Sequence, residues 1–278
     1  MKNIKKTLFF SIIGLMVAVS ACKEDAPAIN FTNNGGGGTV TNRKVLVEEF
    51  TGVRCVNCPG GSQEIQNLIT NTNHKLIAVS IHTGSFSRPY NTSTQDLTLV
   101  PEGDNLNTLL GPVTGYPAAV INRKIFSGEP GRPQTVTKWA GSLATELAIA
   151  SKVELKITPT YNASTRELSF SVDASNLGGF SAANPLSLGV YITEDSITSA
   201  QLLPAGIDDN YIHRHVLRKA LPDYQGTPIA SLPQTKNFQY TIPATWNVNR
   251  LNIVTFLYNN NQANNNVEVI QVEEKKVK

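Results

Sequence analysis

The sequence VLVEEFTGVRCVNCP occupies residues 45–59 and joins an apolar run to a Cys-x-x-Cys pair. The run Val45–Phe50 contains β-branched residues and predicts a buried strand. A helix is predicted over residues 58–70, where apolar side chains recur at three- and four-residue spacing. Cys55 and Cys58 would then lie at a helix N-terminus, where unpaired N–H groups and the helix dipole stabilise a thiolate. The pattern favours thiol–disulfide chemistry.

Strands and helices alternate through the rest of this half of the chain. Apolar runs predict strands at 76–81, 117–122 and 124–126. Apolar residues at three- to four-residue spacing predict a helix at 135–150. Such alternation is typical of a mostly parallel sheet covered by helices. Residues 44–150 are therefore predicted to form an α/β domain.

From residue 151 the pattern changes to short segments separated by turns, with almost no helical periodicity. Seven strands are predicted: 152–161, 168–172, 186–192, 211–217, 238–242, 251–258 and 267–272. Their number and spacing indicate an all-β, immunoglobulin-like sandwich over residues 151–278. His213 and His215 would share one face of a strand, so a metal site with Asp208 or Asp209 is an alternative to a packed histidine pair.

Residues 1–21 have the organisation of a bacterial secretion signal, with a basic start and an uncharged apolar stretch. The residues Val19-Ser20-Ala21-Cys22 resemble the lipobox of bacterial lipoproteins, which implies that Cys22 carries acyl chains. The alternative is an ordinary cleaved signal that leaves a free thiol. The full chain has a net charge of +3, and the signal contains three lysines and no acidic residue, so the chain without its signal is near neutral. Nucleic acid is therefore not an expected partner.

Residues 22–43 predict a flexible tether between the lipid and the folded chain. Two asparagines and four glycines occupy residues 33–38, and glycine loses much backbone entropy when it is ordered. Lys23-Glu24-Asp25 resembles a short tag that sends lipoproteins to the outer face of the outer membrane, although a solvated charge run is the alternative. The expected location is the cell outer membrane, lipid-anchored and facing the exterior.

Residues 45–59 resemble the active-site strand and turn of the thioredoxin fold. The segment GYPAAV at residues 115–120 is similar to the one that holds the cis-proline of that fold. The resemblance implies a thioredoxin-like domain over residues 44–150, with Cys55 as an exposed nucleophile and Cys58 as the resolving thiol. Cys55 and Cys58 would also form the disulfide of the oxidised chain.

The same resemblance assigns roles to three neighbours of the cysteines. Glu49 occupies the position of the buried carboxylate that assists proton removal from the second cysteine. Pro117 would shape a peptide-binding groove, and Arg54 would lower the pKa of Cys55. No cofactor or metal is implied. Arg54 stands where thioredoxin has a tryptophan and Val56-Asn57 replaces Gly-Pro, so the direction of electron flow stays open.

Two other interpretations of the Cys-x-x-Cys pair remain. One is a passive disulfide that stabilises a turn in an oxidising compartment. A zinc site would have to recruit His82 or His74, because the chain has no second cysteine pair. The long insertion between His82 and Gly115 either lines the groove or is a surface excursion.

The whole arrangement, with YITED at residues 191–195 and HRHVLR at 213–218, resembles the family of outer-membrane lipoproteins named for a twenty-eight-kilodalton outer-membrane protein. Members of that family are described mainly as surface antigens or adhesins. Two functions are therefore expected as alternatives. One is a thiol–disulfide oxidoreductase acting on protein thiols or disulfides of the envelope, and the other is a non-enzymatic surface binding protein with a structural disulfide.

Overall fold

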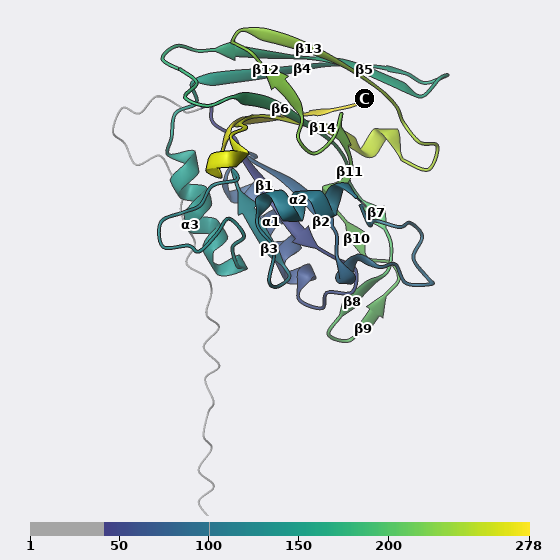
Figure 1. Ribbon diagram of the computed structural model, residues 1–278. Coiled ribbons are helices and arrows are strands. Elements are labelled where there is room, and N and C mark those ends of the chain that lie inside the picture. Colours follow the sequence, from purple (N-terminus) through teal and green to yellow (C-terminus); the bar gives the residue numbers. More distant parts are fainter. Residues whose placement is uncertain (1–41, 100) are drawn as a thin grey trace, which may run out of the picture. The chain divides into compact units, whose positions relative to one another are not determined.

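Several apolar runs between residues 45 and 276 become neighbouring strands of one eight-stranded sheet (Figure 1). The computed structural model describes residues 42–99 and 101–278, and these lie in one compact unit. Along the sheet the order is β15 (Val269–Lys276), β14 (Leu251–Asn259), β6 (Leu186–Glu194), β11 (Val216–Leu221), β2 (Leu76–His82), β1 (Val45–Thr51) and β3 (Ala118–Ile121), and β12 (Thr227–Ile229) pairs with β6. Strands β1, β2, β3 and β6 are buried along their whole length, as expected for a sheet covered on both faces.

Helices cover the two faces of the sheet around β1, which pairs parallel with β2 and antiparallel with β3. Helix α1 (Cys58–Asn71) and helix α3 (Val136–Leu147) pack on one face through a cluster that contains Trp139. Helix α2 (Glu102–Leu110) packs on the other face through Leu106 and Leu110. Because side chains alternate along a strand, Val45 points to the first cluster and Leu46 to the second.

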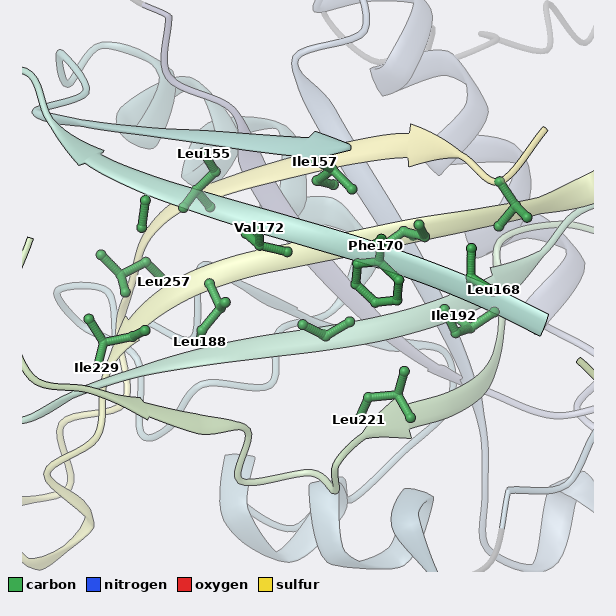
Figure 2. Close-up of a cluster of buried hydrophobic side chains, with 14 of the residues drawn as sticks. Leu155, Ile157, Leu168, Phe170, Val172, Leu188, Ile192, Leu221, Ile229 and Leu257 are labelled. Atoms are coloured by element: carbon green, nitrogen blue, oxygen red, sulfur yellow. The ribbon is translucent and has the colours of Figure 1, made fainter. Parts of the chain in front are cut away.

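A second sheet covers the part of the first that contains β6 and β14. It consists of β4 (Val153–Asn162), β5 (Glu167–Asn176) and β13 (Gln234–Thr241), in the order β13-β5-β4 with antiparallel pairing. Figure 2 shows side chains of β4 and β5, among them Leu155 and Phe170, within the same cluster as Leu188 and Ile192 of β6. Residues 151–278 are therefore mainly strand, as their alternation predicts, and two sheets do face each other here.

The boundary predicted at residue 150 does not separate two sheets. Strand β11 pairs parallel with β2 through Val216 and Ser80, and the Ser80 amide donates to the His215 carbonyl at 2.8 Å. Strands from residues 44–150 and from 151–278 thus share one sheet. The physical reason is that β2, buried on both faces, needs a hydrogen-bonding partner at the edge that β1 leaves open.

Two predicted strands differ from those observed. Residues 124–126 form no strand and lie between two turns. The segment 211–217 is divided into β10 (Ile212–His213) and the start of β11, because His215 adopts a left-handed conformation with φ 54°. The expectation that His213 and His215 share one face is therefore wrong.

Several short elements were not expected from the sequence. They are β7 (Ile197–Thr198), β8 (Gln201–Leu203), β9 (Gly206–Asp208) and the 3₁₀ turns η1 (Ser85–Ser87), η2 (Val248–Arg250) and η3 (Gln262–Asn264). The predicted signal, Cys22 and nearly all of the predicted tether lie outside the described residues. Within residues 42–99 and 101–278, no helix has the length and apolar character needed to cross a bilayer.

Candidate functional site

Cys55 and Cys58 form a disulfide at the N-terminus of α1, with their Cα atoms 5.4 Å apart. The pairing implied by the sequence is confirmed. Cys58 is the first residue of α1, and its amide donates to the Cys55 carbonyl at 3.2 Å. The Cys55 amide donates in turn to the Gly52 carbonyl at 3.0 Å. These bonds fold the chain between β1 and α1 into a tight turn that carries both sulfur atoms.

Both cysteines are buried in this oxidised state, with 3% of Cys55 and 1% of Cys58 exposed. The expectation of an exposed Cys55 is therefore wrong for this state. A stretch that we call the covering segment, residues 196–215, packs against this turn and contains β7 to β10. Its buried Gln201 donates from Nε2 to the Cys55 carbonyl at 3.0 Å, and the Leu202 amide donates to the Val53 carbonyl at 2.8 Å.

The first part of the predicted insertion, residues 83–99, packs against the same turn and is called the insertion loop. The Arg54 amide donates to the Phe86 carbonyl at 2.9 Å. A Cβ on Gly52 would lie 2.5 Å from the Phe86 carbonyl carbon, so this close approach requires glycine. The insertion therefore contacts the cysteine turn directly.

The insertion loop and the covering segment are also linked to each other. Thr92 Oγ1 donates to Asp209 Oδ1 at 2.6 Å, and Ser199 Oγ donates to the Gln95 carbonyl at 3.3 Å. Leu97 of the insertion loop and Ile197 of the covering segment pack together in a small buried cluster. Val53 and Val216 complete this cluster. The two segments thus pack together against the cysteine turn.

The side chain of Arg54 is directed to the insertion loop. It donates from Nε to the Arg88 carbonyl at 2.8 Å and from Nη2 to the Pro89 carbonyl at 2.9 Å. Its guanidinium carbon lies 4.1 Å from the centroid of the Tyr90 ring, a cation–π arrangement. These contacts fix the insertion loop, and an effect of Arg54 on Cys55 stays a prediction.

Glu49 is fully buried below the start of α1. Ser80 Oγ donates to its Oε2 at 3.0 Å, and Ser62 Oγ lies 3.5 Å from its Oε1. Burial raises the pKa of Glu49 from 4.5 to about 7, and the two serine hydrogen bonds oppose that rise. A Cβ on Gly61 would lie 3.1 Å from Glu49 Oε1 and 2.7 Å from Pro117 Cγ, so the three residues pack tightly.

Pro117 therefore lies beside the first turn of α1. The peptide bond between Tyr116 and Pro117 is cis, and the Tyr116 ring lies 5.3 Å from that of Phe86 in the insertion loop. Glu49 and Pro117 thus both lie against the first turn of α1, which begins at the disulfide-bonded Cys58, although they come from separate parts of the sequence.

A cavity of about 230 Å³ opens beside Cys58, between α1, β2 and the covering segment. Its polar lining includes Ser62, His82, Tyr211 and His213. Burial lowers the pKa of His213 to about 4, and burial together with the neighbouring His213 lowers the pKa of His82 well below its usual range. Both imidazoles are therefore neutral at pH 7. The sequence singled out His213 only as a partner of His215 and did not place it or Tyr211 beside α1, because the β2–β11 pairing brings these residues there.

The other histidines do not join this cavity. The Nε2 of His215 lies 2.9 Å from Gln66 Nε2, and its Nδ1 lies 3.5 Å from Asp195 Oδ1. His74 is exposed at the end of α1. Within the described ranges, no three or more side chains of His, Cys, Asp or Glu are arranged to hold a metal ion.

Two solved structures share this fold at low sequence identity. HBP35 of Porphyromonas gingivalis is 16% identical, with a TM-score of 0.66 over 86% of this chain and 77% of that one. Protein AGR_C_4864 from Agrobacterium tumefaciens is 12% identical, with a TM-score of 0.53 over 87% of this chain and 96% of that one. At these identities the likeness concerns the fold alone. Among curated proteins, none matches this chain significantly.

The sequence itself matches one protein family. A domain of the outer membrane lipoprotein Omp28 from P. gingivalis is 19% identical over 46% of this chain and 88% of that one, but its TM-score of 0.34 supports no structural argument. Residues 110–278, more than half of the chain, match the family described as outer membrane protein Omp28. The protein therefore belongs to the Omp28 family of outer membrane proteins.

Proposed function

We propose that this protein is a thiol–disulfide exchange protein whose residues 44–150 form a thioredoxin-like module. The observation that carries the proposal is the Cys55–Cys58 disulfide at the start of α1, next to a buried Glu49 whose pKa burial raises to about 7. A carboxyl with such a pKa accepts and returns a proton near neutral pH. The helix N-terminus favours a thiolate at the same turn.

The exchange follows from these groups. In the reduced protein the Cys55 thiolate attacks a disulfide of a protein substrate, a bond forms between the two sulfurs, and one substrate thiolate leaves. Cys58 loses its proton to the Glu49 carboxylate and attacks Cys55. The Cys55–Cys58 disulfide forms and the second substrate sulfur leaves as a thiolate. Pro117 would border the bound substrate. A protein substrate reaches the sulfur atoms only when the covering segment moves.

A second candidate is a non-enzymatic surface binding protein with a structural disulfide. Two observations favour it. Both cysteines are buried, and large apolar side chains are exposed around the covered turn, namely Val56, Phe86, Ile207 and Ile212. Exposed apolar side chains of this kind are typical of contact surfaces.

The reduction potential of the Cys55–Cys58 disulfide distinguishes the two candidates. For exchange we expect a value between about −270 and −120 mV, the range of thioredoxin-like oxidoreductases, together with reduction of a model protein disulfide. The potential is measured on the full chain by equilibration with glutathione or dithiothreitol. A variant with serine at both Cys55 and Cys58 is the control and should show no turnover. A value below about −300 mV without turnover would mean that the disulfide is structural.

The location proposed for this Omp28-family protein is the outer membrane, through a lipid on Cys22 and with the folded chain facing the exterior. The supporting residues are the lipobox ending at Cys22 and the Lys23-Glu24-Asp25 tag. Cys22→Ser removes the thiol that would carry the acyl chains. We therefore expect this variant to incorporate no labelled palmitate and to be released from membranes, because stable anchoring needs more than one acyl chain. Protease treatment of intact cells tests the orientation. Membrane retention of the serine variant would contradict the lipid anchor.

A further inference from the structure

Glu49 is buried, but both of its hydrogen-bond partners border the cavity beside Cys58. The carboxyl has no exposed surface, so it does not exchange a proton with solvent directly. Ser80 of β2 donates from Oγ to Glu49 Oε2 at 3.0 Å, and Ser62 Oγ of α1 lies 3.5 Å from Oε1. Both serines line the cavity. Each serine thus contacts the buried carboxyl and also borders the cavity.

The covering segment adds a third hydroxyl group to this arrangement. Tyr211 lines the same cavity, and its pKa is raised by burial and by the neighbouring Glu49 carboxylate. A side-chain hydrogen bond with Ser62 opposes that rise. Tyr211 is half-buried, whereas Glu49 is fully buried. The hydroxyls of Ser62 and Tyr211 therefore connect the buried carboxyl with a residue that solvent reaches.

The cavity is large enough and polar enough to admit water. Its volume is about 230 Å³, whereas a single buried water requires only about 10–15 Å³. Buried waters hydrogen-bond to polar groups that have no other partner. The Nδ1 of His82 and the Nε2 of His213 are two such atoms within the described part of the chain, and both residues line the cavity.

The other titratable groups around the cavity do not retain a proton at neutral pH. Burial lowers the pKa of His82 well below its usual range and that of His213 to about 4, so both imidazoles are neutral. Arg214 lines the cavity as a permanent cation, and Cys58 has no thiol proton in the oxidised chain. Strand β3, which pairs with β1 beside Glu49, consists of alanine, valine and isoleucine.

We propose that protons pass between Glu49 and solvent through the hydroxyls of Ser80, Ser62 and Tyr211 and through water in the cavity. The proposal rests on the proposed function only for the reaction that delivers the proton, which is the transfer from Cys58 to Glu49. The route itself operates whenever Glu49 gains or loses a proton, so it is measurable without turnover.

The proton balance is as follows. Cys58 gives its thiol proton to the Glu49 carboxylate when it attacks the mixed disulfide. The protonated carboxyl then donates to a serine oxygen, and the proton of that serine passes to Tyr211 or to a cavity water. The accepting group passes one of its own protons to solvent. Glu49 returns to the carboxylate, each hydroxyl has gained one proton and lost one, and no electrons move.

The rate of proton uptake by Glu49 tests this route in the oxidised full chain. Photolysis of a caged proton lowers the pH rapidly, and the carboxyl infrared band that Glu49→Gln lacks reports the uptake. We expect Ser62→Ala combined with Ser80→Ala to reduce the rate constant of uptake at least about 10-fold, since positioned proton-transfer groups contribute about 10²–10⁴-fold. Tyr211→Phe should reduce it about threefold, because Ser80 still borders the cavity.

Three controls separate proton transfer from a change in structure. Ser164→Ala, at an exposed residue in the turn between β4 and β5, should leave the rate constant unchanged. Ser62→Thr and Ser80→Thr keep the hydroxyls and should stay within about threefold of the parent chain. Imidazole buffer should restore uptake in the double alanine variant and leave the parent unchanged, because imidazole is small enough to enter the cavity and deliver a proton.

A purely structural role of the two serines predicts a different result. Loss of their hydrogen bonds would raise the pKa of Glu49 by slowing proton release, with the rate constant of uptake unchanged. That result overturns the proposal, and so does the absence of a carboxyl band assignable to Glu49. If thermal unfolding shows that the double variant does not fold, Ser62→Ala, Ser80→Ala and Tyr211→Phe are measured singly. Uptake at the parent rate in all three then overturns the proposal.

The measurement uses neither a substrate nor a reductant, so its result does not depend on turnover. A chain with an exchange-active potential and unchanged uptake in the alanine variants would refute only the proton route. A chain with slowed uptake in those variants and no turnover would refute only the exchange function.

Discussion

Replacement of Arg123 by methionine is expected to lower the free energy of unfolding by about 3–5 kcal/mol, because it leaves a buried carboxylate without its partner. Arg123 and Glu48 are both fully buried. The guanidinium donates from Nε to Glu48 Oε2 at 2.9 Å and from Nη2 to Glu48 Oε1 at 2.7 Å. The Tyr191 hydroxyl on β6 completes the network, at 2.7 Å from Arg123 Nη2 and 2.9 Å from Glu48 Oε1.

The aromatic side chains of β14 add to the cost of this replacement. The Arg123 guanidinium carbon lies 4.6 Å from the centroid of the Phe256 ring and 4.9 Å from that of Tyr258. Desolvated cation–π contacts contribute up to about 2 kcal/mol each. The buried ion pair and the aromatic side chains around it therefore connect β1, β6 and β14.

Denaturant unfolding of the oxidised chain at pH 7 measures the effect. Lys138→Met is the control, because its ion pair with Glu129 is exposed, and it should cost less than about 1 kcal/mol. Adding Glu48→Gln to Arg123→Met should recover part of the loss, since it removes the uncompensated charge. A cost for Arg123→Met no larger than that of the exposed control would contradict this account of the network.

Replacement of Glu49 by glutamine is expected to stabilise the protein at pH 8 by about 3 kcal/mol and to leave it little changed at pH 4. Burial raises the pKa of Glu49 from 4.5 to about 7 in the folded state. Between these values the folded chain keeps a proton that the unfolded chain has lost. The free energy of unfolding of the parent chain therefore falls as the pH rises through this window, and the glutamine variant lacks that fall.

The Glu274 carboxyl should also lower the free energy of unfolding as the pH rises. Burial raises the pKa of Glu274 to about 7 as well, so a residual decline should persist in Glu49→Gln. Glu274→Gln is the matched control, which should lose the other part of the decline. Urea unfolding midpoints at intervals from pH 4 to pH 8 give the profiles. If the parent and the Glu49→Gln profiles run parallel, Glu49 does not titrate in this window.

Much of the fold was predictable because the spacing of apolar residues along the sequence distinguishes its strands from its helices. The strand expected at Val45–Phe50 is β1, and the helix expected at 58–70 is α1, each within one residue of its observed end. Continuous apolar runs and three- to four-residue spacing express burial directly in the sequence. The positions of Glu49, Cys55 and Cys58 relative to each other follow from those two elements.

The rest of the site depends on pairing between distant strands, which no local pattern encodes. Val216 and Ser80 meet only because β11 completes the edge of β2, and that contact brings the covering segment to α1. The covering segment consists of strands of two or three residues, too short for a period to be recognised. The burial of Cys55 and the approach of His213 to His82 were invisible for this reason.

The place of the covering segment in the chain also sets the order of events during synthesis. The ribosome makes the cysteine turn long before it makes residues 196–215, and β2 lacks its edge partner until Val216 is available. A nascent chain therefore carries two exposed thiols and an open strand edge at the same time. Because disulfides form in oxidising compartments outside the cytoplasm, oxidation is expected to be fastest while the exported chain is still unfolded, before residues 196–215 pack against the cysteine turn and Cys55 and Cys58 become buried.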